Sequence, residues 1–380
     1  MKSIIYLIPF VLVFTACEFK FEQEVDFNQG YTENKLVVQG VIQPGYPAYV
    51  ILSNSEPYFS PINSSTIDEL YVTDAQIKIS NSEGQSRDLY NINDLINLIP
   101  NNEVISALDS IARLIPGLYL ELPADLNFDF PYNTIGEFGQ QFSLNIYHNG
   151  DTITGTTTIP NEHLMDSVWY KIDEYAPRPN LGNIWFHYSD PDTLGNTIMI
   201  EHKRLAHTKE TKFGDNPPDG ITPNSISVSQ TADPLFAKAL WGFVRNDFEG
   251  LNGTSFDTFF QRGNLSSFLT SEFDDLIFEG EESGYFKSGQ SILEHNKTVY
   301  PDTVLVRFSQ IDYESYLFLR SADYQSQSTG NPFAEPINLQ SNITNGLGGF
   351  YGQAATYYKI ICKEDTNYTE KYFPLIDEIL

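Results

Sequence analysis

The fold class of this chain is decided by the stretch FSLNIYHNGDTIT, residues 142–154. Phe142, Leu144 and Ile146 alternate with polar residues, which is the period of a half-buried β-strand. The dipeptide Asn149-Gly150 favours a two-residue hairpin turn, and the Thr-Ile-Thr that follows supplies a returning strand. The sequence therefore predicts an antiparallel β-hairpin here.

Strand signals recur on both sides of this hairpin. Residues 36–42 are β-branched and apolar on both faces, which is typical of a buried strand. Further strands are predicted at 49–52, 75–79, 156–160, 168–172, 184–188, 197–200 and 303–308. Short strands joined by turns predict a mainly β protein. We expect an immunoglobulin-like β-sandwich over residues 35–160 and a larger C-terminal β-rich domain, with one or two helices, over residues 161–380.

Two stretches have the period of a helix instead. Apolar residues recur at spacings of four, three and four before a Pro-Gly stop, at Val104, Leu108, Ile111 and Ile115. They predict a helical insert near 101–115, with its apolar stripe packed on the sandwich or, alternatively, facing a partner. A second helix is predicted around 312–326. The polar stretch 208–234 contains a Pro-Pro pair and is expected to form a long exposed loop.

The N-terminus has the pattern of a secretory signal. Lys2 precedes an apolar run from Ile4 to Phe14, and two small residues separate that run from Cys17. The run is too short for a membrane-spanning helix, which needs about 20 residues. A cysteine directly after the cleavage point is typical of a lipoprotein.

We therefore expect residues 1–16 to be a lipoprotein signal peptide and residues 17–34 to be an acidic tether. Cys17 would carry acyl chains such as palmitate, and several chains on one residue make a durable anchor in a lipid bilayer. An ordinary signal peptide followed by a chance cysteine is the alternative.

The net charge narrows the possible partners, and the cysteine content narrows the possible disulfides and metal sites. The formal net charge is −28, which disfavours nucleic acid and anionic lipid as partners. The hydrophobic fraction of 41% is enough for folded cores. If Cys17 is acylated, Cys362 is the one cysteine that remains, so no intramolecular disulfide and no cysteine-based metal site can form. Its apolar surroundings predict a buried side chain.

Several motifs together resemble a known family. They are LVVQGVIQPG at 36–45, VTDAQIKI at 72–79, TTTIP at 156–160, LMDSV at 164–168, NPFAEP at 331–336 and SNITNGLGGFYG at 341–352. The combination resembles an uncharacterised lipoprotein family of Bacteroidota, domain of unknown function 4249. The resemblance implies an outer-membrane lipoprotein, often at the cell surface, that works alongside a TonB-dependent receptor. It implies no activity, no cofactor and no catalytic residues.

Candidate chemistry in the sequence is sparse. Asp190, Asp192 and Asn196 have a spacing that could hold Ca²⁺, although an Asp-Pro turn explains them as well. The acidic run 272–282 is expected to be a solvated loop. Residues 346–352 lack the Gly-Lys-Ser/Thr ending of a phosphate loop, so we expect a structural turn. No serine-hydrolase or His-Glu-x-x-His motif is present, and no catalytic residue is predicted.

Modification and contact sites are predicted from two further patterns. An Asp-Ser/Thr-apolar pattern resembles the O-glycosylation site of secreted Bacteroidota proteins and occurs at Ser110, Thr152, Ser167, Thr193 and Thr303. Aromatic stretches at 241–243 and 256–260 are expected as loops that contact a partner or ligand, or else as core.

Together these observations predict a non-catalytic outer-membrane accessory or binding subunit that partners a TonB-dependent barrel. The cell surface is the expected location, and the periplasmic face is the alternative. A stand-alone surface adhesin or structural module is the second hypothesis. A glycan-active hydrolase is the third, because carboxylates are plentiful but cannot be paired from sequence.

Overall fold

The computed structural model describes a chain that is mainly β, as predicted, with a few helices. It describes residues 35–55, 70–99, 102–125, 132–172, 182–215, 219–224, 226–233, 236–238, 244–246, 250, 252–261, 290–293, 298–328, 339–362 and 366–379. Cys17, the acidic run 272–282 and the aromatic stretch 241–243 lie outside these residues.

One large sheet runs through most of this chain. Its strands are β1 (Leu36–Ile42), β2 (Tyr49–Asn54), β3 (Gln76–Asn81), β4 (Ser86–Asn91), β5 (Leu118–Glu121), β6 (Gln141–His148), β7 (Asp151–Thr158), β10 (Thr197–Lys212), β11 (Ile226–Thr231), β12 (Ala237–Lys238), β13 (Val244–Asn246), β17 (Thr303–Ile311), β18 (Ile343–Thr344) and β19 (Leu347–Ile361). The order is β11-β10-β17-β19-β1-β2-β5-β4-β3-β6-β7-β18, with β12 and β13 also paired to β10.

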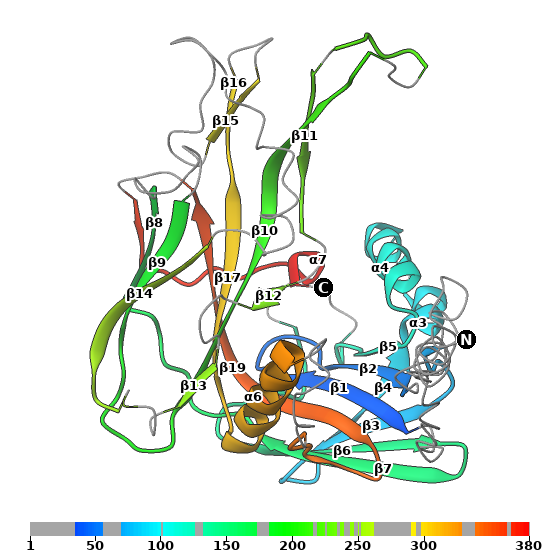
Figure 1. Ribbon diagram of the computed structural model, residues 1–380. Coiled ribbons are helices and arrows are strands. Elements are labelled where there is room, and N and C mark those ends of the chain that lie inside the picture. The colour runs from blue at the N-terminus through cyan, green and yellow to red at the C-terminus, as the bar shows by residue number, and fades with distance from the viewer. Residues whose placement is uncertain are drawn as a thin grey trace, which may run out of the picture.

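Strand β19 joins the two halves of this sheet. Its first residues pair in parallel with β1, and its later residues pair antiparallel with β17. Figure 1 shows β19 beginning beside β1 in the part of the sheet formed by β1–β7, here called the N-terminal sheet, and rising beside β17 into the part formed with β10 and β17, here called the tall C-terminal sheet. The close approach to β1 requires glycine at Gly348, where φ is +103° and a Cβ would collide with the carbonyl oxygen of Val38. Of the residues 346–352 that were expected to form a structural turn, all but Gly346 belong to the start of strand β19.

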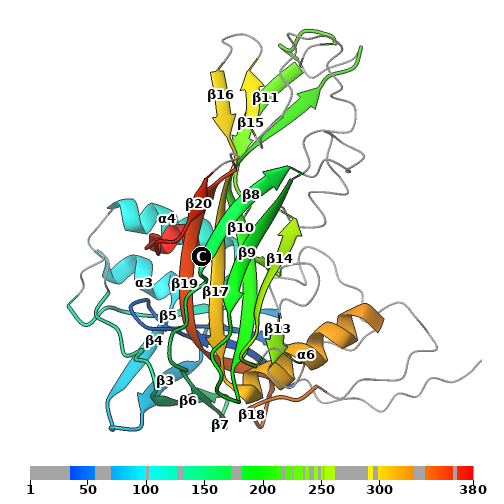
Figure 2. The same cartoon turned by 90° about the vertical axis from the view of Figure 1, so that its left-hand side faces the viewer.

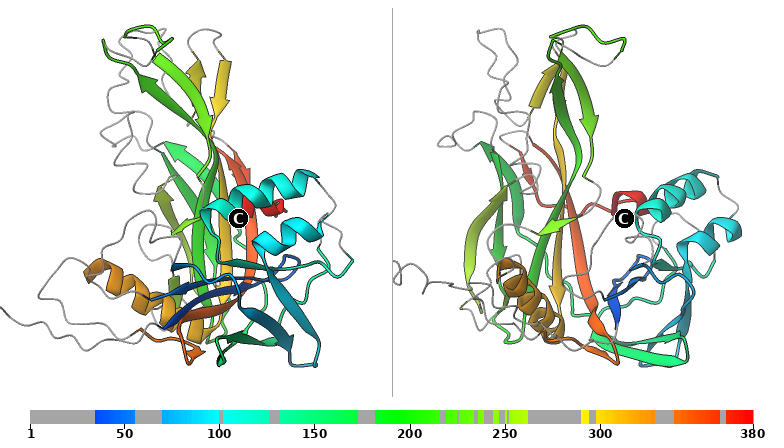
Figure 3. Two further views of the ribbon diagram at one scale, coloured as in Figure 1. Left: turned by 90° about the vertical axis from the view of Figure 1, so that its right-hand side faces the viewer. Right: turned by 45° about the vertical axis from the view of Figure 1, so that its right-hand side comes forward.

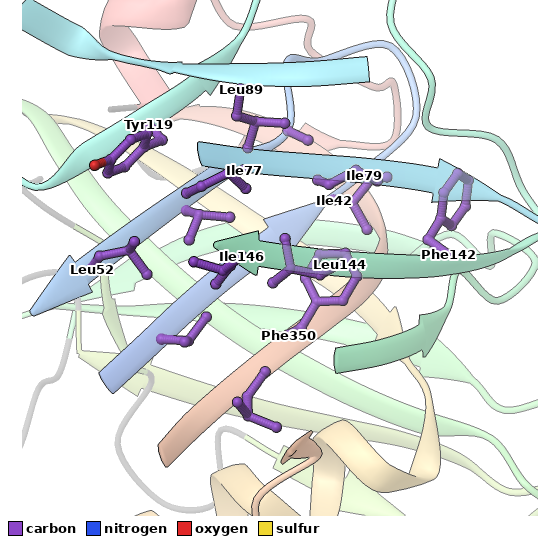
Figure 4. Close-up of a cluster of buried hydrophobic side chains, with 14 of the residues drawn as sticks. Ile42, Leu52, Ile77, Ile79, Leu89, Tyr119, Phe142, Leu144, Ile146 and Phe350 are labelled. Atoms are coloured by element: carbon purple, nitrogen blue, oxygen red, sulfur yellow. The ribbon is translucent and has the colours of Figure 1, made fainter. Parts of the chain in front are cut away.

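The N-terminal sheet curls around its own core (Figure 4). Ile77, Leu144 and Ile146 point inward from neighbouring strands, and Phe350 enters the same core from β19. The predicted hairpin is confirmed as β6–β7. Its turn residues Asn149 and Gly150 both have positive φ, as a type I′ turn requires.

A second sheet packs on the tall part of the first. It consists of β8 (Ser167–Ile172), β9 (Gly182–Ser189), β14 (Ser255–Gln261) and β20 (Asn367–Tyr368), in the order β14-β9-β8-β20. Figure 2 shows it in front of β17 and β19. The core between the two sheets includes Tyr188, Phe260, Phe308 and Cys362, so the predicted burial of Cys362 is confirmed. The stretch 256–260, expected as a loop, is strand β14.

The helices cover the open faces of the sheets (Figure 3). The predicted helical insert is confirmed as α4 (Asn102–Leu114), and α3 (Ile92–Leu98) precedes it. Both pack through apolar side chains against β5. The second predicted helix is confirmed as α6 (Tyr313–Ser328), and a short helix α7 (Ile376–Ile379) lies near the C-terminus.

The prediction of a long loop over residues 208–234 was wrong for residues 208–212 and 226–231, which are strand, while the described residues between them lie in no helix or strand. Strand β10 continues to Lys212, and β11 pairs with its end to form a projecting hairpin. The β-branched residues of this stretch favour strands, but its overall polarity concealed that preference. A smaller hairpin, β15 (Gln290–Leu293) with β16 (Thr298–Pro301), lies beside it (Figure 1).

Candidate functional site

A cleft of about 180 Å³ lies where the N-terminal sheet, the helical insert and the tall C-terminal sheet meet. Figure 3 shows α4 facing the tall sheet across this region, with α7 between them. The cleft is lined by Gln39, Tyr49, Ile51, Ile111, Ile115, Leu118, Glu201, Phe236, Arg307 and Ile379. One side of it is apolar and the other carries charge.

The charged side is a cross-strand row on the tall sheet. Arg307 on β17 lies directly opposite Glu201 on β10 and opposite Tyr357 on β19. The Arg307 Nε and Nη2 atoms donate to Glu201 Oε2 at 2.7 and 2.6 Å. The Arg307 side chain is only 7% exposed, so this ion pair is buried. Removing one partner of such a pair leaves an uncompensated charge, which is strongly destabilising.

Aromatic groups surround the guanidinium. The ring of Phe236 lies 4.1 Å from the Arg307 guanidinium carbon, within the range of a cation–π interaction. Tyr49 also lines the cleft, Tyr357 lies opposite Arg307 in the register of the sheet, and both hydroxyls interact electrostatically with the guanidinium. Burial favours a lower pKa for Arg307, but the Glu201 carboxylate and the two tyrosines outweigh it and raise that pKa. Arg307 therefore stays charged.

The tyrosines beside the row stay neutral. Burial raises the pKa of Tyr357 to about 12, and its hydroxyl donates to Gln43 Oε1 at 3.0 Å. Burial also raises the pKa of Tyr49 and of Tyr351. At neutral pH these hydroxyls are hydrogen-bonding groups and not acids or bases. The row is therefore suited to holding a bound group in place.

The apolar side comes from the helical insert and the chain end. Ile111 and Ile115 of the predicted helical stripe line the cleft, while Leu108 of the same stripe packs into the core beneath. Ile379 of α7 also lines the cleft. An ion pair between Lys359 Nζ and Glu378 Oε1 at 2.9 Å holds α7 against β19.

Comparison with models of known protein families shows the family to which this chain belongs. The model of the family described as "Domain of unknown function (DUF4249)" matches residues 20–359. The chain belongs to this family. The match spans every strand that lines the cleft of this DUF4249 protein. No curated protein and no solved structure matches the chain.

Sequence reasoning missed the charged row of this DUF4249 protein. Arg307 interrupts the apolar run of β17, and Glu201 ends the apolar run at 198–200 of β10; a charge beside buried strand residues is the signal that could have found them. Charged residues are almost never buried unless they are paired, so two such charges in buried strands predict an ion pair. The partner of each could still not be assigned, because 106 residues separate them.

The three predicted calcium ligands lie near one another in the loop after β9. Asp190 is buried, and its Oδ2 accepts from the Gly253 amide at 3.3 Å. Asp192 Oδ1 accepts from Asn252 Nδ2 at 3.0 Å, and Asn196 Nδ2 donates to the Thr193 carbonyl at 2.7 Å. Within the described part of the chain, no group of three or more His, Cys, Asp or Glu side chains could hold a metal ion.

The predicted O-glycosylation residues are scattered over the molecule. Thr152 and Thr193 are exposed, and Thr152 lines a second, polar hollow of about 330 Å³ beside the β6–β7 turn. Ser167 and Thr303 are half-buried, and Ser110 lies on α4. Among the described residues no helix is long and apolar enough to cross a membrane.

Proposed function

We propose that this DUF4249 protein is a lipid-anchored binding subunit of the outer membrane of Bacteroidota. In this proposal Cys17 is acylated, residues 17–34 tether the fold to the bilayer at the cell surface, and the folded part accompanies a TonB-dependent receptor. The signal pattern of residues 1–16 and the membership of the family support it. The protein binds its partner without catalysis.

The cleft is the observation that carries this proposal. Its volume of about 180 Å³ is below the ~300–1,000 Å³ of a typical small-molecule site, but it fits one large apolar side chain. Interfaces draw much of their affinity from such anchor side chains in desolvated pockets. The apolar wall formed by Ile111, Ile115 and Ile379 would contact the anchor, and the Arg307–Glu201 pair would orient it. We therefore assign the cleft as the socket for an anchor residue of the barrel partner.

Two finer features of the fold also belong to the proposal. We propose that residues 35–160 form an immunoglobulin-like sandwich and that residues 161–380 form the second domain. The hairpins β3–β4 and β6–β7 support the first, and the two packed sheets around Phe308 support the second. Strand β19 then acts as the link that crosses between them.

The test is purification of the tagged full-length protein from its native outer membrane in mild detergent. We expect a β-barrel receptor to co-purify in comparable amount. Ile111→Lys places a charge in the cleft and should release the barrel. Leu114→Lys is the matched control, because Leu114 lies on the same helix and is 65% exposed. Cys17→Ala should release the protein from the membrane.

Recovery of the unmodified protein without a barrel contradicts the accessory role, and the stand-alone adhesin then takes its place. Retention of the barrel by Ile111→Lys contradicts the assignment of the cleft but leaves the accessory role standing. The two parts of the proposal can therefore fail separately.

A further inference from the structure

The outer face of the four-stranded sheet carries a row of aromatic side chains. Trp185 on β9 lies directly opposite Trp169 on β8 and Phe259 on β14. The ring centroids are 6.3 Å apart for the tryptophan pair and 4.6 Å apart for Trp185 and Phe259. The planes of the two tryptophans differ by 20°. These three side chains form a continuous aromatic strip across three strands.

The strip is accessible although the sheet beneath it is packed. Phe256 and Phe260, on either side of Phe259 along β14, pack against the inner core. Phe259 is 42% exposed, and Trp169 and Trp185 are half-buried. Large aromatic residues bury 150–250 Å² each when they are enclosed in a core. Three of them in one row at the surface therefore contribute less to the stability of the fold than they would in a core. A surface strip of this kind is typical of a binding site.

Polar groups lie along the next row of the same face. His187 lies two residues after Trp185 on the same face of β9. It is directly opposite Asp257 on β14 and Ser167 on β8. His187 Nδ1 lies 2.6 Å from Asp257 Oδ1, and His187 Nε2 lies 3.8 Å from Asp166 Oδ2. The carboxylates of Asp166 and Asp257 are about half exposed, so their oxygens have further hydrogen-bond acceptor sites open to solvent. They can accept hydrogen bonds from hydroxyl groups.

We infer that this face binds a neutral glycan chain. The negatively polarised faces of aromatic rings attract the C–H groups of sugar rings, and the adjacent carboxylates can accept hydrogen bonds from sugar hydroxyls. Single-stranded nucleic acid also stacks on aromatic rows, but the net charge of −28 and the two neighbouring aspartates repel it.

The glycan site is independent of the cleft. The strip lies on the far side of the four-stranded sheet, while the cleft lies on the opposite side of the tall sheet against which that sheet packs. Figure 1 shows β8, β9 and β14 on one side of β17 and the helical insert on the other. Binding at the strip therefore does not require a barrel partner.

The test is native gel electrophoresis of the full-length protein, in mild detergent, through gels that contain mixed-linkage β-glucan, galactomannan, arabinoxylan or glycogen. We expect at least one of these polysaccharides to retard the protein. Phe259→Ala and Asp257→Asn should weaken the binding about tenfold, since each removes one contact at an exposed position. Tyr147→Ala is the matched control, because Tyr147 is 47% exposed on a strand of the other sheet.

Intrinsic fluorescence gives a second measurement. Two of the three tryptophans of the chain lie in the strip, so an oligosaccharide of the retarding polysaccharide should change the emission of the wild-type protein. Unchanged mobility in all four gels overturns the inference. Equal retardation of wild type and Phe259→Ala, or retardation abolished by salt, also overturns it. Loss of a co-purified protein from Phe259→Ala without any polysaccharide effect assigns the strip to a protein interface instead.

Discussion

Glu121 should make the stability of this protein depend on pH in an unusual direction. Its side chain is fully buried on β5, and Oε1 accepts from the Ile135 amide at 2.8 Å while Oε2 accepts from the Ala48 amide at 3.1 Å. The nearest cation is Arg87, whose Nε lies 3.8 Å away. Burial outweighs these contacts and raises the pKa of Glu121 to about 7.

The sign follows from proton binding in the two states. The folded protein holds the Glu121 proton up to a pKa of about 7, whereas the unfolded chain loses it near the ordinary value of 4.5. The folded state therefore binds more protons between these values, and the free energy of unfolding falls as the pH rises through that window. One pKa unit corresponds to about 1.4 kcal/mol, so the full loss is about 3 kcal/mol. It is complete above about pH 7.

The assay is urea unfolding of the wild type and Glu121→Gln at about pH 5 and about pH 8. The glutamine variant cannot titrate, so the stability advantage of the wild type should shrink by about 2 to 3 kcal/mol between the two conditions. Asp88→Asn is the control for loss of one surface carboxylate, since Asp88 is 58% exposed on neighbouring β4. A difference between wild type and Glu121→Gln that is the same at both pH values would refute the reasoning.

Three further predictions concern the ion pair of the cleft, strand β19 and the thiol of Cys362. Glu201→Gln leaves the Arg307 charge buried without its carboxylate and should lower the free energy of unfolding by about 3 kcal/mol or more in urea titration; a loss below about 1 kcal/mol contradicts the buried pair. Gly348→Ala should prevent folding, because the new Cβ meets the backbone of β1, and the far-UV circular dichroism spectrum should then lack the β-sheet signal. Gly84→Ala is the control: its Cβ lies in open space, so the strained backbone should lower the free energy of unfolding by only about 1 kcal/mol. Cys362 should react with a thiol reagent only after unfolding, and rapid labelling of the folded protein contradicts its burial.

Local features of the fold were predictable because their cause lies within a few residues. The hairpin at residues 142–154 contains both its alternation and its turn, and the structure forms it as predicted. The spacing of apolar residues likewise predicts the helix Asn102–Leu114. Long-range pairing leaves no such signal. Nothing near β19 indicates that its first half will lie parallel to β1, which comes about 300 residues earlier in the chain.

The candidate sites were harder to predict for the same reason. Sequence patterns identified the apolar stripe of the insert, but not that Ile111 would face Arg307 across a cleft. The aromatic stretch 256–260 was recognised as a possible contact, yet its role depends on strand alternation. Phe256 and Phe260 turn into the core, and only Phe259 joins the strip. A loop assignment concealed this division between the two faces.

Strand β19 explains why the cleft belongs to neither half of the chain alone. Successive side chains of a strand face opposite sides, so Tyr357 turns toward the cleft while Tyr358 enters the core beneath the four-stranded sheet. Earlier in the same strand, Phe350 fills the N-terminal core. The Arg307 row therefore lies beside one continuous strand whose side chains are buried in three separate cores. Sites built on rigid elements hold their geometry better than sites on loops, so we expect the cleft to vary little in width.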